Sequence, residues 1–355
     1  LPQIQSGLIN TAIIASPVTP IFNDEYGLYH NTPPFQTPQI YSPMVGLELR
    51  KNTRISDEYR AVGSVFAELT FLEHFTAKAS FLYDYGFNGI RSYTPIVNVY
   101  DPNIQGTDKT STLVRTTSVS QEQNTYKKAQ SDWLLTYKNN WGDHSLTATA
   151  GFTTYYRGYE GIITNVGQGS GDPIPNDPRF FYTTMGDQTT RSIGGSQWER
   201  ATLSYLVRGL YNYKGKYLLN GSFRRDGSSA FLGSNRWQNS GAIGAGWVVS
   251  EESFMQDQQL FDNLKIKGSW GVLGNENTGD SYRYPVYPTL VSGSSTSFGD
   301  NIYPALSPAY SPDPNLRWES VHSWEAGFEA KMLKNRLSLE AVYYDKKTKD
   351  ILVEV

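Results

Sequence analysis

The sequence predicts an all-β fold, namely an antiparallel up-and-down transmembrane β-barrel of which about ten strands are present. Two observations predict this fold: apolar and polar residues alternate over long runs, and the connections between runs alternate between short and long. Composition is the third. Charged residues make up 18% of the 355 residues, against roughly 25% in soluble proteins, while aromatic residues reach 14%. A lipid-facing band, aromatic girdles and a polar lumen together give this balance.

The alternation has the period of two that defines a β-strand with two unlike faces. Over 323–332, for example, Trp324, Phe328 and Met332 alternate with Glu325 and Glu329. Runs of about 9–13 residues suit tilted strands that cross a bilayer. The predicted strands are 60–72, 74–86, 128–140, 144–157, 200–213, 216–226, 237–250, 262–272, 319–333 and 335–348.

The connections follow a strict order of long and short, which in outer-membrane barrels separates extracellular loops from periplasmic turns. Short turns are expected at 73–74, 140–143, 214–216 and 334–335, and a helical turn within 250–263. Long, polar loops are expected at 87–127, 157–199, 226–236 and 273–318.

The chain is expected to have two regions. Residues 1–59 are rich in proline and predict an irregular, loop-rich segment with one strand near 45–51, whereas residues 60–355 predict barrel strands with long extracellular loops. The first five residues lack the charged and apolar regions of a signal peptide, so we expect a mature or internal piece of a protein.

Composition also limits the partners and the chemistry. The net charge of −3 without a long basic run argues against nucleic acid, and the absence of cysteine excludes disulfides and thiol nucleophiles. No apolar stretch approaches the 18 residues of a transmembrane helix. The four histidines are not at ligand spacing, so no metal site or cofactor is predicted. Glu251 and Glu252 are expected to cap a short helix rather than to act as catalytic carboxylates. The sequence therefore does not predict an enzyme.

From about residue 205 onward, five stretches together form a recognisable pattern. They are FRRDGSSAF at 223–231 with RW at 236–237; GW at 246–247 with SEESF at 250–254; LKIKGSWG at 264–271 with GN at 274–275; PNLRWE at 314–319 with EAGFE at 325–329; and NRL at 335–337 with YYDKKTKDIL at 343–352. In this order and spacing, the chain resembles the SusC/RagA-type TonB-dependent transporters of bacterial outer membranes.

The resemblance implies a barrel of about 22 strands, of which this chain would be the middle portion. It implies a surface lipoprotein lid of the SusD type, oligosaccharide or peptide cargo, surrounding outer-membrane lipid, and TonB acting through an N-terminal region and plug that this sequence does not contain. Two alternatives remain open from the residues alone: a siderophore or cobalamin receptor of the same architecture, and a surface adhesin or soluble β-domain that binds a protein partner.

Alternation assigns side chains to the lumen or to the lipid. Arg224 and Asp226 end a predicted strand at the loop side, where a ligand role competes with a structural one in which Asp226 and Gly227 open the loop. Trp318, at a loop-to-strand junction, is assigned to the aromatic girdle. The candidates for contact with the lumen or the ligand are Arg208, Arg224, Asp226, Lys265, Lys267, Glu325, Glu329 and Arg336. The expected lipid or interface anchors are Trp247, Trp270, Trp324, Phe328 and Tyr343.

Overall fold

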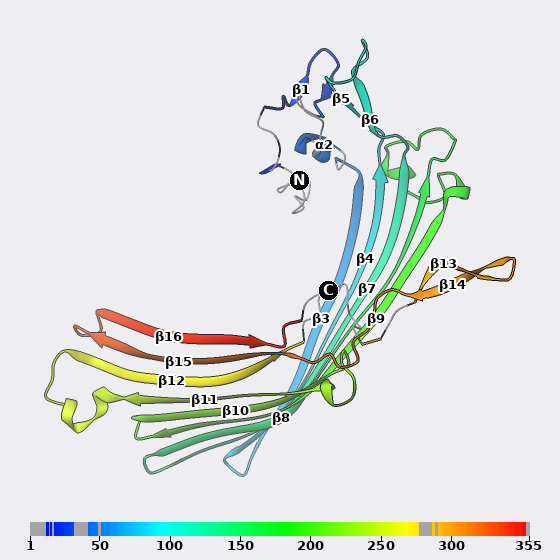
Figure 1. Cartoon of the computed structure of the whole chain (residues 1–355). Coiled ribbons are helices and arrows are strands. Elements are labelled where there is room, and N and C mark those ends of the chain that lie inside the picture. The colour runs from blue at the N-terminus through cyan, green and yellow to red at the C-terminus, as the bar shows by residue number, and fades with distance from the viewer. Residues whose placement is uncertain are drawn as a thin grey trace. The chain divides into compact units, whose positions relative to one another are not determined.

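The computed structural model describes residues 12–13, 15, 18–31, 42–48, 51–276, 286–287 and 290–352. Its main element is a sheet of ten strands in the order β16-β15-β12-β11-β10-β9-β8-β7-β4-β3 (Figure 1). Each strand therefore lies beside the strands that precede and follow it among these ten. This confirms the predicted antiparallel up-and-down arrangement and the number of strands.

The ten strands correspond one to one with the ten predicted runs, and the short turns lie where they were expected. The main difference is the length of the strands. Several of them, such as β7 and β8, extend beyond the predicted apolar alternation into the segments expected as long loops. Their bounds are β3 (Arg54–Phe71), β4 (Phe75–Thr94), β7 (Ser118–Trp141), β8 (His144–Gly167), β9 (Ser192–Tyr213), β10 (Tyr217–Ser228), β11 (Trp237–Val248), β12 (Phe261–Asn275), β15 (Glu319–Met332) and β16 (Leu337–Lys349).

The chain divides into two compact units: one of 1–61, 85–126 and 159–197, and one of 62–84, 127–158 and 198–355. Among its described residues, the first unit contains two small hairpins, the short helix α2 and two 3-10 turns. These are β1 (Phe22–Asn23) with β2 (Leu28–Tyr29), β5 (Val97–Tyr100) with β6 (Thr110–Val114), α2 (Pro43–Glu48), η1 (Pro178–Phe180) and η2 (Gln188–Thr190).

The prediction of a strand near 45–51 is wrong, because Pro43–Glu48 form the helix α2. Proline at the first helical position favours a helix, since its fixed φ is already helical and its missing N–H has no partner to lose. Val45, a residue of this helix, is buried. The apolar residues of this stretch therefore follow a helical turn rather than a strand.

The long connection between β8 and β9 packs into the core of the first unit. Phe181 is fully buried, and its ring stacks on Tyr93 of β4 at 5.1 Å with an interplanar angle of 2°. The Tyr93 hydroxyl donates a hydrogen bond of 2.8 Å to the carbonyl of Ile174. Val119 and Val166 complete this buried cluster. The connection predicted as a loop of 157–199 is therefore shorter and packed.

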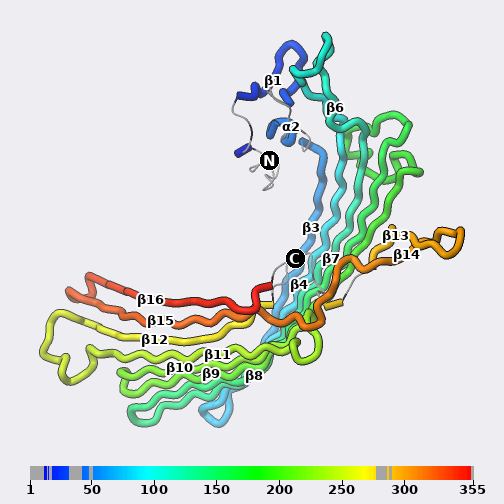
Figure 2. Tube along the Cα trace, in the orientation of Figure 1, coloured from blue at the N-terminus to red at the C-terminus, as the bar shows by residue number. Residues whose placement is uncertain are grey.

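The second unit contains the hairpin of β13 (Leu290–Phe298) and β14 (Asn301–Pro308), which lies inside the connection predicted as 273–318. The part of this unit that the structure describes also contains the 3-10 turns η3 (Gly233–Arg236), η4 (Val249–Glu251) and η5 (Ser253–Met255). The last two confirm the helical turn expected within 250–263. The tube in Figure 2 follows β10, β11, β12, β15 and β16 of this unit as successive neighbours.

Trp318 does not belong to an exposed girdle. It is buried with Phe231 and Ala230, its ring lies 5.4 Å from that of Phe231, and its Nε1 donates a 3.1 Å hydrogen bond to the carbonyl of Arg236. A buried indole needs a partner for its N–H, and this backbone carbonyl supplies one. The expected girdle position is thus corrected: Trp318 anchors the loop that follows β10.

Candidate functional site: the polar face of the barrel wall

The strand register of the second unit separates two faces of the sheet from β9 to β16. Cross-strand partners share a face, so the pairs Trp247↔Ile266↔Phe328 and Trp270↔Trp324 define one of them. We call it the aromatic face; Tyr343, the partner of Ala326, lies on it as well. The opposite face, which contains the partners Lys265 and Glu329, is called the polar face. Most of its large side chains are exposed, with Trp270 at 52% and Tyr343 at 68%, whereas Phe328 is half-buried.

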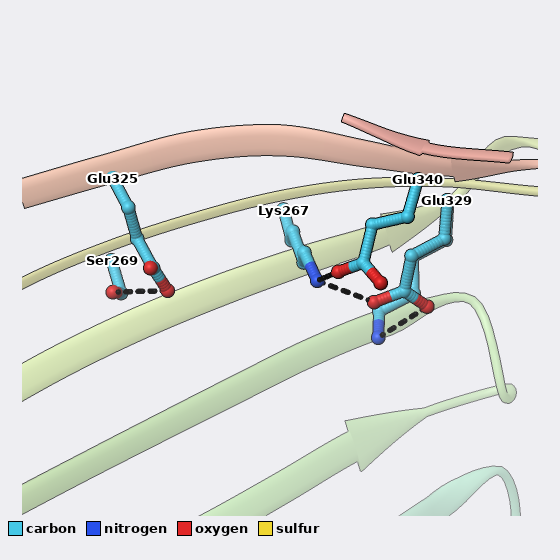
Figure 3. A network of polar contacts seen from close by, with 6 residues as sticks. Lys267, Ser269, Glu325, Glu329 and Glu340 are labelled. Atoms are coloured by element: carbon cyan, nitrogen blue, oxygen red, sulfur yellow. Dashed lines mark hydrogen bonds and ion pairs between the residues drawn. The ribbon is translucent and has the colours of Figure 1, made fainter. Parts of the chain in front are cut away.

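A network of charges crosses three strands of the polar face (Figure 3). The Lys267 Nζ on β12 lies 2.6 Å from Glu329 Oε1 on β15 and 2.6 Å from Glu340 Oε1 on β16. Lys265 Nζ approaches the other oxygen of Glu329 at 3.6 Å. Two ammonium groups and two carboxylates are thus joined in one cluster, whose formal charges cancel.

The lysine reaches Glu340 because a glycine lies between them. Gly327 on β15 is the cross-strand partner of both Lys267 and Val342. A Cβ at this position would collide with the Ala341 carbonyl oxygen and lie 3.0 Å from Val342 Cα. The absence of a side chain therefore permits close approach of β15 and β16 and leaves the Lys267 chain free to cross. Two residues after Lys267, on the same face of β12, Ser269 Oγ donates a hydrogen bond to Glu325 Oε1 at 3.1 Å.

A second polar cluster lies where β9 and β10 approach the loops. Arg224 Nε lies 2.6 Å from Asp226 Oδ1, and its Nη2 donates to the buried Ser204 Oγ at 3.0 Å. Ser204 in turn donates to the same Asp226 oxygen at 2.5 Å. Asp226 is a residue of β10, which continues to Ser228, so the strand does not end in the turn expected at Asp226 and Gly227. These contacts favour the structural role of Arg224.

The remaining candidates are more isolated. Arg208 is the partner of Ser222 and so belongs to the polar face, where its side chain is exposed. Arg336 lies in the turn between β15 and β16 and not in a strand. The register thus brings together Lys265, Lys267 and Glu329, with Glu325 nearby, whereas Arg208 and Arg336 lie apart from that cluster.

Sequence reasoning missed the role of Glu252. Instead of capping η5, for which its side chain makes no capping bond, its Oε1 accepts hydrogen bonds from the Tyr217 hydroxyl at 2.7 Å and from Trp247 Nε1 at 3.1 Å. Lys216 Nζ lies 3.3 Å from Oε2. The carboxylate therefore ties the η4–η5 segment to the ends of β10 and β11. The only signal in the sequence was an acidic residue close to a Lys-Tyr pair in a neighbouring turn.

This contact predicts a pH dependence. The hydrogen bonds from Tyr217 and Trp247, followed by the Lys216 ammonium, lower the pKa of Glu252 below its ordinary value of 4.5. The stabilisation is therefore complete above about pH 4.5 and is lost as the pH falls through the lowered pKa. We expect Glu252→Gln to unfold more easily than the wild type at neutral pH, with a smaller loss of stability between about pH 5 and pH 3. Urea unfolding followed over this pH range measures both; an unchanged slope in the variant would contradict the assignment, and Glu251→Gln is the matched control.

The described residues offer no metal centre, since no group of three or more His, Cys, Asp or Glu side chains gathers among them. Within the same part of the chain, no helix has the length and the apolar character needed to cross a membrane. The polar face presents ion pairs and hydrogen-bonding groups that are bonded mainly to one another. Such an arrangement is suited to a stable polar surface.

Comparison with known proteins decides the family. The family model described as TonB dependent receptor-like, beta-barrel, matches residues 16–355. The chain belongs to this family. Among TonB-dependent receptors, P26 of Formosa agariphila is 29% identical over 99% of this chain and 34% of its own length. SusC of Bacteroides thetaiotaomicron is 34% identical over 43% of this chain and 15% of its own length.

Solved structures show the same fold. The RagAB peptide transporter matches 92% of this chain and 34% of its own chain, with a TM-score of 0.71 and 21% identity. The resemblance to SusC/RagA-type transporters and the outer-membrane location that it implied are therefore confirmed. The chain spans about a third of the length of P26 and of the matched RagAB chain.

Proposed function

We propose that this chain is part of the barrel of an outer-membrane importer that takes up a bulky nutrient, a glycan or a peptide, in a TonB-dependent manner. The observation that carries the proposal is the division of one sheet into an exposed aromatic face and a polar face whose charges are paired across strands. A wall between lipid and an aqueous lumen requires such a division. The barrel is then a static wall and performs no covalent chemistry.

In this proposal, the polar face lines the lumen. Its contacts with a plug or with cargo are made by Arg208, Lys265, Lys267, Glu325 and Glu329, and Arg336 contributes from its turn. Arg224 and Asp226 belong to the same face and serve mainly to hold the end of β10 through Ser204. Trp247, Trp270, Trp324, Phe328 and Tyr343 on the aromatic face contact outer-membrane lipid. We assign residues 60–355 to the wall with its extracellular loops and residues 1–59 to the segment that precedes it, with the first wall strand, β3, already beginning at Arg54.

A groove in the first unit offers both polar and apolar contacts to a large cargo. It has a volume of about 660 Å³, and polar side chains (Gln123, Thr125, Glu160, Ser196 and Gln197) and apolar ones (Phe87, Ile162 and Ile193) line it together. Amide and hydroxyl side chains can both donate and accept hydrogen bonds, as sugar hydroxyls and peptide groups require.

The partners in this proposal follow from the relatives. SusC and the RagAB peptide transporter support a glycan or peptide as cargo and a SusD-like surface lipoprotein as a lid. TonB would act through an N-terminal region of the complete protein, and its pull on the plug would use the inner-membrane proton gradient. The siderophore or cobalamin receptor remains the alternative within the same architecture.

The proposal is tested by uptake in cells. We expect deletion of the gene to abolish growth on an oligosaccharide mixture or on a tryptic peptide mixture as sole nutrient, and the complete gene to restore it. Loss of TonB is expected to have the same effect as the deletion. Uptake that persists without TonB would contradict energy-coupled import, and a deletion strain that fails only on ferric siderophores or cobalamin would favour the alternative.

A further inference from the structure

The aromatic face changes character toward the loop end of the strands. The register of successive strand pairs defines one row across the sheet, Val207↔Phe223↔Gly241↔Val272↔His322↔Lys347. The next position toward the loops holds Arg225 on β10, beside Tyr205 and Asn239, and Lys349 on β16, beside Ser320. We call Arg225, Lys347 and Lys349 the basic rim. All three side chains are exposed.

Arg225 is held in place by aromatic rings and not by an acid. Its guanidinium carbon lies 5.1 Å from the centre of the Trp237 ring, and Tyr205 stacks on the same indole at 6.3 Å with an angle of 23°. The indole itself lies over Gly227, where a Cβ would come within 2.9 Å of several ring atoms. The glycine therefore makes room for the ring that supports the arginine.

The adjacent arginine shows the contrast. Arg224 points to the polar face and is occupied by Asp226 and Ser204. For Arg225, the part of the chain that the structure describes provides no ion pair, only the cation–π contact. Stacking on a ring leaves the edge of the guanidinium, with its fork of N–H donors, available for an anion. Lys347 is only loosely paired, at 4.0 Å from Asp345, and is 74% exposed.

Beyond the basic rim, the same face is mainly apolar. Phe223 and Val272 lie in the row of Lys347, the next row holds Ile243, Trp270 and Trp324 and ends on β16 with Asp345, and the third holds Leu219 and Tyr343. An occupant that satisfies both parts must have anionic groups above and hydrocarbon chains below. Four strand spacings of about 4.8 Å separate β10 from β16, so the rim extends over about 19 Å, which is wider than one phosphate group.

We propose that the basic rim binds the phosphate groups of a phosphorylated glycolipid of the outer leaflet, a lipid of the lipopolysaccharide type, whose acyl chains lie on the apolar rows beneath. This inference rests on the proposed function in one respect, namely that the aromatic face contacts lipid and the loop end is extracellular. Charge complementarity selects the occupant: Arg225 offers the bidentate geometry that suits phosphate, and the two lysines add point charges.

The test uses the complete, purified transporter in nanodiscs and diphosphorylated lipid A as the probe, with the dephosphorylated form of the same lipid for comparison. We expect Arg225→Gln to weaken binding of the phosphorylated lipid about fivefold, and the triple variant Arg225→Gln/Lys347→Gln/Lys349→Gln about hundredfold. Binding of the dephosphorylated lipid should be weak and equal in all proteins. Raising the salt concentration should reduce the difference.

The matched control is Lys138→Gln/Lys331→Gln/Lys334→Gln, which removes the same charge away from the rim and should bind as the wild type does. Equal affinity of the wild type and the rim variant, or no preference for the phosphorylated lipid, would overturn the inference. Quenching of Trp270 and Trp324 by brominated lipids tests the underlying assumption separately. Quenching without rim-dependent binding refutes the rim alone, whereas absent quenching refutes the lipid-facing wall of the proposed function.

Discussion

Replacing Phe181 with alanine is expected to destabilise the connection between β8 and β9 by about 3–5 kcal/mol, the usual cost of removing a buried phenylalanine. Phe181 has no exposed surface, and its ring is the partner of Tyr93. Without it, the hydroxyl of Tyr93 keeps only its bond to the Ile174 carbonyl. Hydrogen exchange of residues 168–191 in the complete protein measures the free energy of opening of this segment.

The control is Met185→Ala in the same connection, where the side chain is 43% exposed and little change is expected. If exchange in 168–191 is equally fast in both variants and in the wild type, the packing of this segment is not what orders it. If only Phe181→Ala exchanges faster, the connection is a pre-organised surface. A cargo would then meet it without the entropy cost of ordering a flexible loop.

Substituting Gly327 with alanine is expected to lower the free energy of unfolding by about 1–3 kcal/mol, because an added methyl group in a closely packed strand pair forces the backbone apart. The clash is with the backbone of Ala341 and Val342 rather than with a flexible side chain. The displacement also interferes with the path of Lys267 to Glu340. Urea unfolding of the barrel in bilayers or detergent, followed by tryptophan fluorescence, measures the change.

Gly209→Ala on β9 is the matched control, since a Cβ there meets no atom within 4 Å. It should be neutral or slightly stabilising, because alanine restricts the unfolded chain more than glycine does. Equal destabilisation by both substitutions would mean that strand glycines act only through backbone entropy. A neutral Gly327→Ala would show that β15 and β16 tolerate a wider separation than the structure has.

The strands were predictable because lipid on one side and polar groups on the other impose a period of two. Trp270 and Lys267, for example, are an odd number of residues apart in one strand, which places them on opposite faces. Alternation does not predict the parts of a strand that lack two unlike faces. Residues Ser118 to Lys127 of β7 and Gly158 to Gly167 of β8 continue as strands without a clear apolar alternation. There, the polar and glycine-rich composition predicted loops, while backbone pairing decided the structure.

The polar site was predictable by residue type and face, but not by its contacts. Alternation assigned Lys265, Lys267 and Glu329 to one side, whereas the link to Glu340 depends on the register between β15 and β16 and on Gly327. Trp318 and Glu252 were misassigned for a related reason. Their partners, Phe231 and Tyr217, are far away in sequence, so local pattern carries no information about them.

The hairpin of β13 and β14 forms a sheet of its own, while β12 and β15 on either side of it pair directly with each other. The pair β5 and β6 is inserted in the same way between β4 and β7. Since doubling the length of a flexible connection costs only about 0.6 kcal/mol of closure entropy, such insertions can grow, shrink or be exchanged while the register of the wall is kept. Evolution can therefore diversify what the outer surface recognises without redesigning the membrane-spanning structure that carries it.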